Sequence, residues 1–186
     1  PDKDRWMAQL YGKTLPWSSF FMESLCDSLI KLAVRGPEIQ GLATLCPQEG
    51  VEELIRKVLD QATGERWLSL SSHLPALAEA APYAFLRAVE ASLKEDGAPV
   101  KSLLADGSEN TLTGRCWHAD LLWGLEVTAW NSLQLARVTL ILADLSHVPI
   151  KANWANNPTG SLVGLFRCWL PQTAASLKVR LEALDL

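Results

Sequence analysis

The chain has 186 residues, of which 48% are hydrophobic and 20% are charged, and its formal net charge is −4. This balance is typical of a globular domain with a core of its own and excludes an intrinsically disordered chain. It also argues against a dedicated nucleic-acid surface, because phosphate binding needs clustered Lys and Arg and no basic run here exceeds a pair. The four widely spaced cysteines indicate a reduced, cytoplasmic chain, and no apolar stretch reaches the ~20 residues of a membrane span.

Two amphipathic helices are predicted in the first third of the chain. Ser18 or Ser19 can cap a helix that runs to about Val34, and the Gly-Pro dipeptide at 36–37 ends it. In the second helix, over 51–59, apolar residues follow the i, i+3, i+4, i+7, i+8 pattern of a helix with one buried face. Its opposite face carries two acid-before-base pairs at i, i+4, namely Glu52–Arg56 and Glu53–Lys57.

A first helical hairpin is predicted after residue 64. Ser71 or Ser72 can cap its first helix, with Pro75 in the first turn, and Pro82 opens a second helix that runs through Leu93. A short helix over 100–105 follows. Residues 106–114 are rich in Gly, Ser, Asn and Thr and are predicted as the longest loop.

A second hairpin is predicted over 117–147, with Asn131 or Ser132 capping its latter helix. That helix carries two adjacent apolar stripes: Leu135, Val138, Leu142 and Leu145, and beside them Leu133, Ala136, Leu140 and Ala143. A stripe of this width is expected to be covered from two directions, as in a helix between stacked repeats.

A third hairpin is predicted over 161–186, with a break at Pro171. Its inner face is expected to consist of Leu177, Leu181 and Leu184, and its outer face carries the pair Lys178–Glu182. No segment shows sustained period-2 alternation, so the fold class is all-α. Three sequential hairpins without a strict consensus predict an α-α superhelix of the irregular HEAT or armadillo kind.

We expect a single domain over 1–186, divided into N-terminal helices (1–64), a first hairpin (65–115) and the second and third hairpins (116–186). Because the chain begins at Pro1 and ends within an uncapped helical run, we also expect it to be a fragment of a longer polypeptide.

Several residues could carry chemistry, but none makes a convincing catalytic or metal site. One group has metal-ligating side chains: Cys116, His118 and Asp120. Zinc would need further ligands at short spacing, so a surface or satisfied histidine is favoured. Another group has the residue types of a hydrolase triad: Asp144, His147 and Ser161. No nucleophile turn accompanies it, and His147 is better explained by the helix dipole. Glu126, within an apolar helix, is expected to face solvent or to pair with a cation such as Arg137.

The candidates for partner binding are Trp123, Trp130, Asn153, Trp154 and Asn156. The two tryptophans of the second hairpin are either core filler or exposed anchors, and sequence alone does not separate these cases. The other three residues belong to the loop NWANNPTG, which is either a structural turn or a recognition loop. The turn is favoured because Asn and Pro concentrate in turns.

The segments LLWGLEVTAWNSLQLARVTLILADL, NWANNPTGSLVGLF and WLPQTAASLKVRLEALDL resemble a helical-repeat region of large bacterial multidomain proteins, and GERWLSLSSHLPALAEAAPYAFLRAVEASL extends the likeness upstream. Such regions accompany effector or nucleotide-hydrolysing modules in proteins that look like antiphage STAND-type NTPases. The chain departs from the usual pattern before Asn153, where it has the residues VPIKA, and at 130–132. The resemblance implies a helical-repeat fold and transfers no catalytic residue.

Residues and resemblance together predict a non-catalytic helical-repeat module, without metal or cofactor, that scaffolds or senses a protein partner or another domain of its parent. One alternative is a nucleic-acid-binding solenoid that uses basic residues of successive helices: Arg87, Lys94, Arg115 and Arg137. A second alternative is an unrecognised hydrolase that uses His147 or His118.

Overall fold

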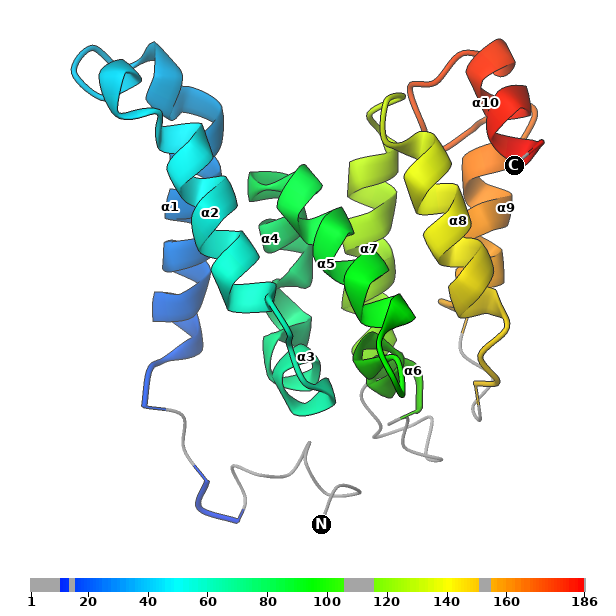
Figure 1. Cartoon of the computed structure of the whole chain (residues 1–186), viewed down its shortest axis with the longest axis horizontal. Coiled ribbons are helices and arrows are strands. Elements are labelled where there is room, and N and C mark those ends of the chain that lie inside the picture. The colour runs from blue at the N-terminus through cyan, green and yellow to red at the C-terminus, as the bar shows by residue number, and fades with distance from the viewer. Residues whose placement is uncertain (1–10, 14–15, 106–115, 151–154, 186) are drawn as a thin grey trace.

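A computed structural model describes residues 11–13, 16–105, 116–150 and 155–185. Within these ranges the chain forms helices and turns and has no β-strand, which confirms the all-α prediction (Figure 1). None of the described helices is both long enough and apolar enough to cross a membrane.

The helices follow one another at short intervals. Their bounds are α1 Ser19–Arg35, α2 Pro47–Leu59, α3 Gly64–Leu70, α4 Leu74–Ala80, α5 Pro82–Lys94, α6 Ser102–Ala105, α7 Trp117–Ala129, α8 Leu135–Ser146, α9 Pro158–Phe166 and α10 Leu177–Leu184. Short 3-10 turns lie at Gly36–Glu38, Ala43–Leu45, Ser71–His73 and Pro99–Lys101.

The longer helices form two layers. In one layer α1 packs on α4, α4 on α7 and α7 on α9; in the other α2 packs on α5, α5 on α8 and α8 on α10. Across the layers α1 contacts α2, α4 contacts α5 and α7 contacts α8. In Figure 1 the first layer runs upward and the second downward, and chain order follows the long axis of the molecule from α1 to α10. Each element therefore packs mainly against elements close to it in sequence.

Side-chain caps and prolines set most of the helix starts. Ser18, Thr63, Asn157 and Ser176 each accept a hydrogen bond from the backbone N–H three residues further on. Prolines occupy the first turn of α2, α4, α5 and α9, where the missing N–H leaves no hydrogen bond unmade. The cap predicted at Ser18 is thus confirmed.

Two other predicted caps are wrong. Residues 64–70 already form α3, so Ser71 and Ser72 lie in a 3-10 turn and α4 begins at Leu74 without a side-chain cap. In the second hairpin the Asn131 side chain accepts from the N–H of Leu133 and closes a turn instead of starting a helix. Consequently α8 begins at Leu135.

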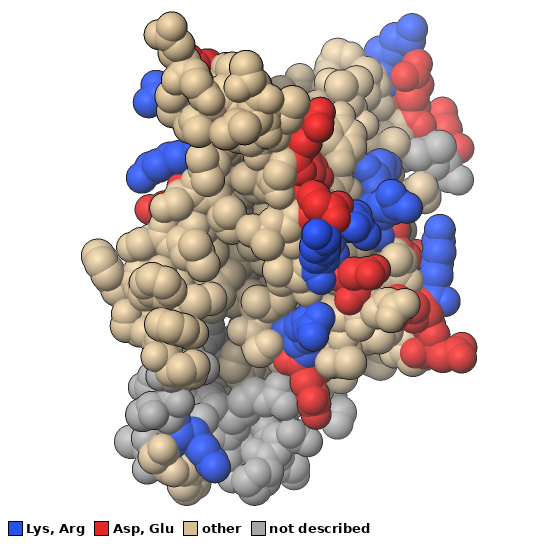
Figure 2. Space-filling model, turned by 60° about the vertical axis from the view of Figure 1, so that its left-hand side comes forward, with Lys and Arg blue, Asp and Glu red and all other residues tan. Residues whose placement is uncertain are grey.

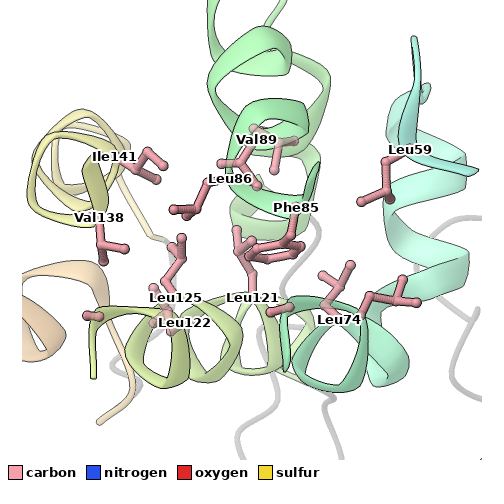
Figure 3. Packing of buried hydrophobic residues seen from close by; sticks show 14 of the residues in the cluster. Leu59, Leu74, Phe85, Leu86, Val89, Leu121, Leu122, Leu125, Val138 and Ile141 are labelled. Atoms are coloured by element: carbon pink, nitrogen blue, oxygen red, sulfur yellow. The ribbon is translucent and has the colours of Figure 1, made fainter. Parts of the chain in front are cut away.

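One continuous apolar core joins the two layers (Figure 3). Its centre lies between α4, α5 and α7, where Phe85 is fully buried. The residues labelled in Figure 3 are Leu59, Leu74, Phe85, Leu86, Val89, Leu121, Leu122, Leu125, Val138 and Ile141. Gly124 of α7 faces this centre, and a Cβ there would lie 3.2 Å from Phe85 Cζ and 3.3 Å from Leu74 O. The absence of a side chain at Gly124 allows α7 to approach α4 closely.

Some apolar residues expected to be buried are exposed. The side chains of Leu177, Leu181 and Leu184 are 62%, 53% and 57% exposed, so the inner face predicted for α10 is wrong. The helix packs on the core through Val179 and Ala183 instead.

The second stripe of α8 is also uncovered at two of its positions. Leu133 and Leu140 are exposed, whereas Leu135, Val138 and Leu142 are buried as predicted. Helix α8 is nevertheless covered from two directions, because it packs against α5 and α7 on one side along the stack and against α9 and α10 on the other (Figure 1). Only the exposure of Leu133 and Leu140 differs from the prediction.

Ion pairs follow the prediction in part. Glu53 pairs with both Arg56 and Lys57, and Lys178 pairs with Glu182 at 3.9 Å. The predicted Glu52–Arg56 pair is not formed, because a Glu52 carboxylate oxygen accepts a hydrogen bond of 2.9 Å from the backbone N–H of Ala84 at the start of α5. Glu52 thus links α2 to the positive end of α5's helix dipole.

Candidate protein-interaction site

Helix α7 exposes a row of large apolar side chains on the face opposite the core. Trp123, Val127 and Trp130 follow one another at i, i+4 and i+7 and are 48%, 47% and 60% exposed. Leu121 and Leu125 of the same helix are fully buried. Since the helix is apolar around most of its circumference, core packing explains only one of its two apolar sides. We call Trp123, Val127 and Trp130 the α7 stripe.

The C-terminal end of the α7 stripe borders an open depression of about 360 Å³, lined by Glu126, Val127, Trp130 and Gln172. Its lining is mostly apolar, and it is shallow and open to solvent. A depression of this kind suits a side chain of a protein partner better than a small metabolite, which is usually enclosed on most sides.

The segment that follows α9 builds one wall of this depression. The hydroxyl of Thr173, which is buried, donates to the Ala129 carbonyl at 2.7 Å, and the N–H of Ala174 donates to the Trp130 carbonyl at 3.2 Å. These bonds satisfy carbonyls at the end of α7 that lack a partner within the helix. The backbone N–H of Gln172 donates to the Gly164 carbonyl at 3.0 Å, which holds the wall against α9.

Glu126 joins α7 to α9 beside the depression. Its carboxylate accepts a 2.6 Å hydrogen bond from the Ser161 hydroxyl. The expected pairing with Arg137 is wrong, because Arg137 forms a two-pronged ion pair with Glu90 of α5 at 2.8 and 2.9 Å. The Ser161 hydroxyl therefore links α9 to α7. The residue that caps α9 is Asn157.

Near the other end of α7, His118 fixes the start of the helix. Its Nε2 donates a hydrogen bond of 2.9 Å to the Asn156 carbonyl, and Cys116 Sγ lies 3.3 Å from the same nitrogen. Burial lowers the pKa of His118, while the carbonyls of Asn156 and Leu103 oppose this shift. Burial also raises the pKa of the Cys116 thiol. A neutral imidazole bound to a carbonyl and a protonated thiol form a structural contact and not an activated nucleophile.

The predicted partner-binding residues do not form one cluster. Trp123 and Trp130 share the α7 stripe, whereas Asn156, although exposed, lies beside His118. Twelve residues separate His118 from Trp130, or about 18 Å along the helix axis. Asn153 and Trp154 lie outside the described residues.

The side chains of His147 and Ser161, which were considered for catalysis, are bonded to other groups. His147 Nδ1 lies 2.8 Å from the Ala143 carbonyl of its own helix, and Ser161 is bonded to Glu126. Among the described residues, no three His, Cys, Asp or Glu side chains are arranged to hold a metal ion.

The basic residues proposed for a nucleic-acid surface do not form a track either. Arg137 is taken up by Glu90, and Arg115 lies outside the described residues. Arg87 lines a groove between α2 and α5 in which Glu49, Glu52 and Glu53 also lie. Figure 2 shows acidic and basic side chains mixed on this side of the molecule, with no extended basic surface on the face in view.

Sequence reasoning missed two parts of the site. Val127 could have been found, because it falls midway in the i, i+4, i+7 series with the two tryptophans. Gln172 gave no signal, since a contact made across more than 40 residues leaves no local pattern. No protein-family model, curated protein or solved structure matches this chain.

Proposed function

We propose that this chain is a non-catalytic helical-repeat module, an α-α superhelix of irregular hairpins, which binds a protein partner through the α7 stripe. The observation that carries the proposal is that α7 buries one apolar side in the core and leaves a second, containing two tryptophans, exposed to solvent. The ordered pairing of helices in two layers supports the superhelix, because each hairpin then stacks on its neighbour in sequence. The resemblance to bacterial repeat regions would make the partner another domain of a larger parent or a target that it senses.

The α7 stripe has the properties of an interaction hot spot. Tryptophan is the residue most enriched at such positions, and rigid indoles lose little entropy on binding. Each half-exposed indole still presents on the order of 100 Å² of apolar surface, and burying it is worth roughly 2–3 kcal/mol. The hydrogen bonds from Thr173 and Ala174 hold the end of α7 in place, so little ordering would be needed on binding.

The test is a binding titration with candidate partners, beginning with the other domains of the parent protein. We expect Trp130→Ala and Trp123→Ala each to weaken binding by roughly tenfold or more. Tyr83→Ala is the matched control, because Tyr83 is an aromatic residue that is 53% exposed on α5 and does not belong to the α7 stripe. Loss of affinity equal in all three variants, or wild-type affinity in both α7 variants, would contradict the proposal.

A further inference from the structure

The α1 end of the two-layer stack carries an apolar surface. Trp17, Phe21, Leu25 and Leu32 are exposed and recur along one side of α1, away from Cys26 and Ala33, which are buried. The rings of Trp17 and Phe21 stack with centroids 5.3 Å apart. Figure 2, in which this end of the molecule comes forward, shows a broad area without charged side chains. We call these four residues the α1 end surface.

The opposite end of the stack carries a second apolar surface. Leu177, Leu181 and Leu184 lie at i, i+4 and i+7 on the side of α10 that faces away from its contact with α8. Trp169 and Leu170, in the segment that precedes α10, are exposed as well. We call the three leucines the α10 end surface. The stack thus ends at both sides in apolar helix faces.

We infer that a second copy of this chain covers these surfaces, with the α10 end surface of one copy packed against the α1 end surface and α2 of the next. Both ends present one helix of each layer, and the layers run in the same directions at both ends (Figure 1). Stacking one copy on the next therefore repeats the packing that already joins the hairpins within the chain. Leu54 of α2, the helix that packs on α1, is also exposed and adds to the apolar area at this end of the stack.

The order of charged residues along α2 and α10 supports this packing of one copy on the next. On α10, Lys178 precedes Glu182, and on α2, Glu53 precedes Lys57; both pairs are four residues apart and exposed. Since α2 and α10 run in the same direction in Figure 1, laying them side by side places Lys178 opposite Glu53 and Glu182 opposite Lys57. Opposite charges then meet at both positions, where Lys57, Lys178 and Glu182 have exposed partners within their own helices and Glu53 is also bonded to Arg56 at 2.7 Å.

Because the inferred interface joins two different surfaces, a pair of copies keeps one free α1 end surface and one free α10 end surface. Such head-to-tail contacts form a ring when the rotation closes and an open filament when it does not. This inference does not depend on the α7 stripe, which lies on a different face of the stack.

The experiment measures the mass of the full chain in solution by sedimentation velocity over a wide range of concentration. We expect the wild type to form species larger than a dimer as concentration rises. Leu25→Glu and Leu181→Glu should each be monomeric alone, because each destroys one end surface. Mixed in equal amounts they should form a one-to-one dimer, because each still has one intact end. Leu140→Glu, at an exposed leucine of α8 in the middle of the stack, is the matched control and should associate like the wild type.

Other outcomes would overturn the inference. A wild type that stays monomeric at every concentration removes it. A dimer abolished by one variant and untouched by the other indicates a two-fold symmetric contact through one end only. The register has its own test: exchanging the charges of Glu53 and Lys57 should weaken association roughly tenfold, and exchanging Lys178 and Glu182 in the same chain should restore it. Circular dichroism of every variant shows that a loss of association is not a loss of folding.

Discussion

Replacing Gly124 by alanine tests whether the close approach of α7 to α4 is as tight as the structure indicates. An added Cβ would lie 3.2 Å from Phe85 Cζ, 3.3 Å from Ala78 Cβ and 3.3 Å from the Leu74 carbonyl oxygen. Two of these three atoms are a backbone oxygen and a Cβ of α4, so they cannot move aside unless the whole helix shifts. Gly50, an exposed residue in the first turn of α2, is the matched control, because a Cβ there meets nothing within 4 Å.

The two substitutions should have opposite effects on the free energy of unfolding. Alanine in place of glycine within a helix stabilises by up to about 1 kcal/mol, and this gain should be seen at Gly50. At Gly124 the same gain is opposed by an overpacking cost of about 1–3 kcal/mol. We therefore expect Gly124→Ala to be about 1–3 kcal/mol less stable than Gly50→Ala.

Urea unfolding followed by far-ultraviolet circular dichroism measures both values under identical conditions. Equal stabilisation by the two substitutions would show that α4 and α7 are further apart than described, or that they separate without cost. A larger residue gives a second point on the same scale: Gly124→Val should lose more stability than Gly124→Ala. If valine were tolerated as well as alanine, the reasoning from close packing would fail.

Three further predictions concern single contacts. Breaking the half-buried Glu90–Arg137 pair between α5 and α8 should reveal a coupling of about 1 kcal/mol in a double-mutant cycle of unfolding free energies, and additive effects would refute it. Cys26 is buried, and burial raises the pKa of its thiol, whereas Cys168 is exposed. In the folded protein a thiol reagent should therefore modify Cys168 at least roughly tenfold faster than Cys26, as mass spectrometry of the labelled peptides can show. Because burial lowers the pKa of His118 below its usual 6.5, the unfolded chain binds the proton more readily, and stability should fall as pH drops below that value. His118→Asn should remove this part of the pH dependence, and an unchanged pH profile in the variant would contradict the assignment.

The helices were predictable where apolar residues recur at helical spacing next to a clear terminator. Helix α2 buries Val51, Ile55 and Leu59 of the pattern over 51–59, although Leu54, which belongs to the same pattern, is exposed. Helix α5 opens at Pro82 as predicted, because proline fixes the first turn. Local rules were sufficient in these cases, because each helix has a clear start and a face that neighbouring helices cover.

Periodicity groups residues on a face but does not say which way that face points. Leu177, Leu181 and Leu184 do share one side of α10, yet Val179 and Ala183 form a second apolar side, and this second side packs on the core. Of the described helices, α8 packs against α10, and it meets the side that carries Val179 and Ala183. The choice of face is thus decided by tertiary neighbours, which the local sequence does not encode.

For the candidate site, too, the sequence indicates which residues share a face but not what lies against that face. An apolar helix with more large residues than one buried face can hold indicates that some of them are exposed, but the sequence does not say that these are Trp123 and Trp130. Thr173, which holds the end of α7 from a position 44 residues further along the chain, could not be predicted from spacing.

The placement of the tryptophans gives the protein its own optical probes. Of those described, Trp67 is fully buried, whereas Trp17, Trp123, Trp130 and Trp169 are exposed. The exposed indoles should therefore emit at long wavelength and be quenched by iodide, whereas Trp67 should give a blue-shifted, protected component. A blue shift on mixing would then report on surfaces being covered rather than on folding, and single Trp→Phe changes would show whether the α7 stripe or an end of the stack is covered.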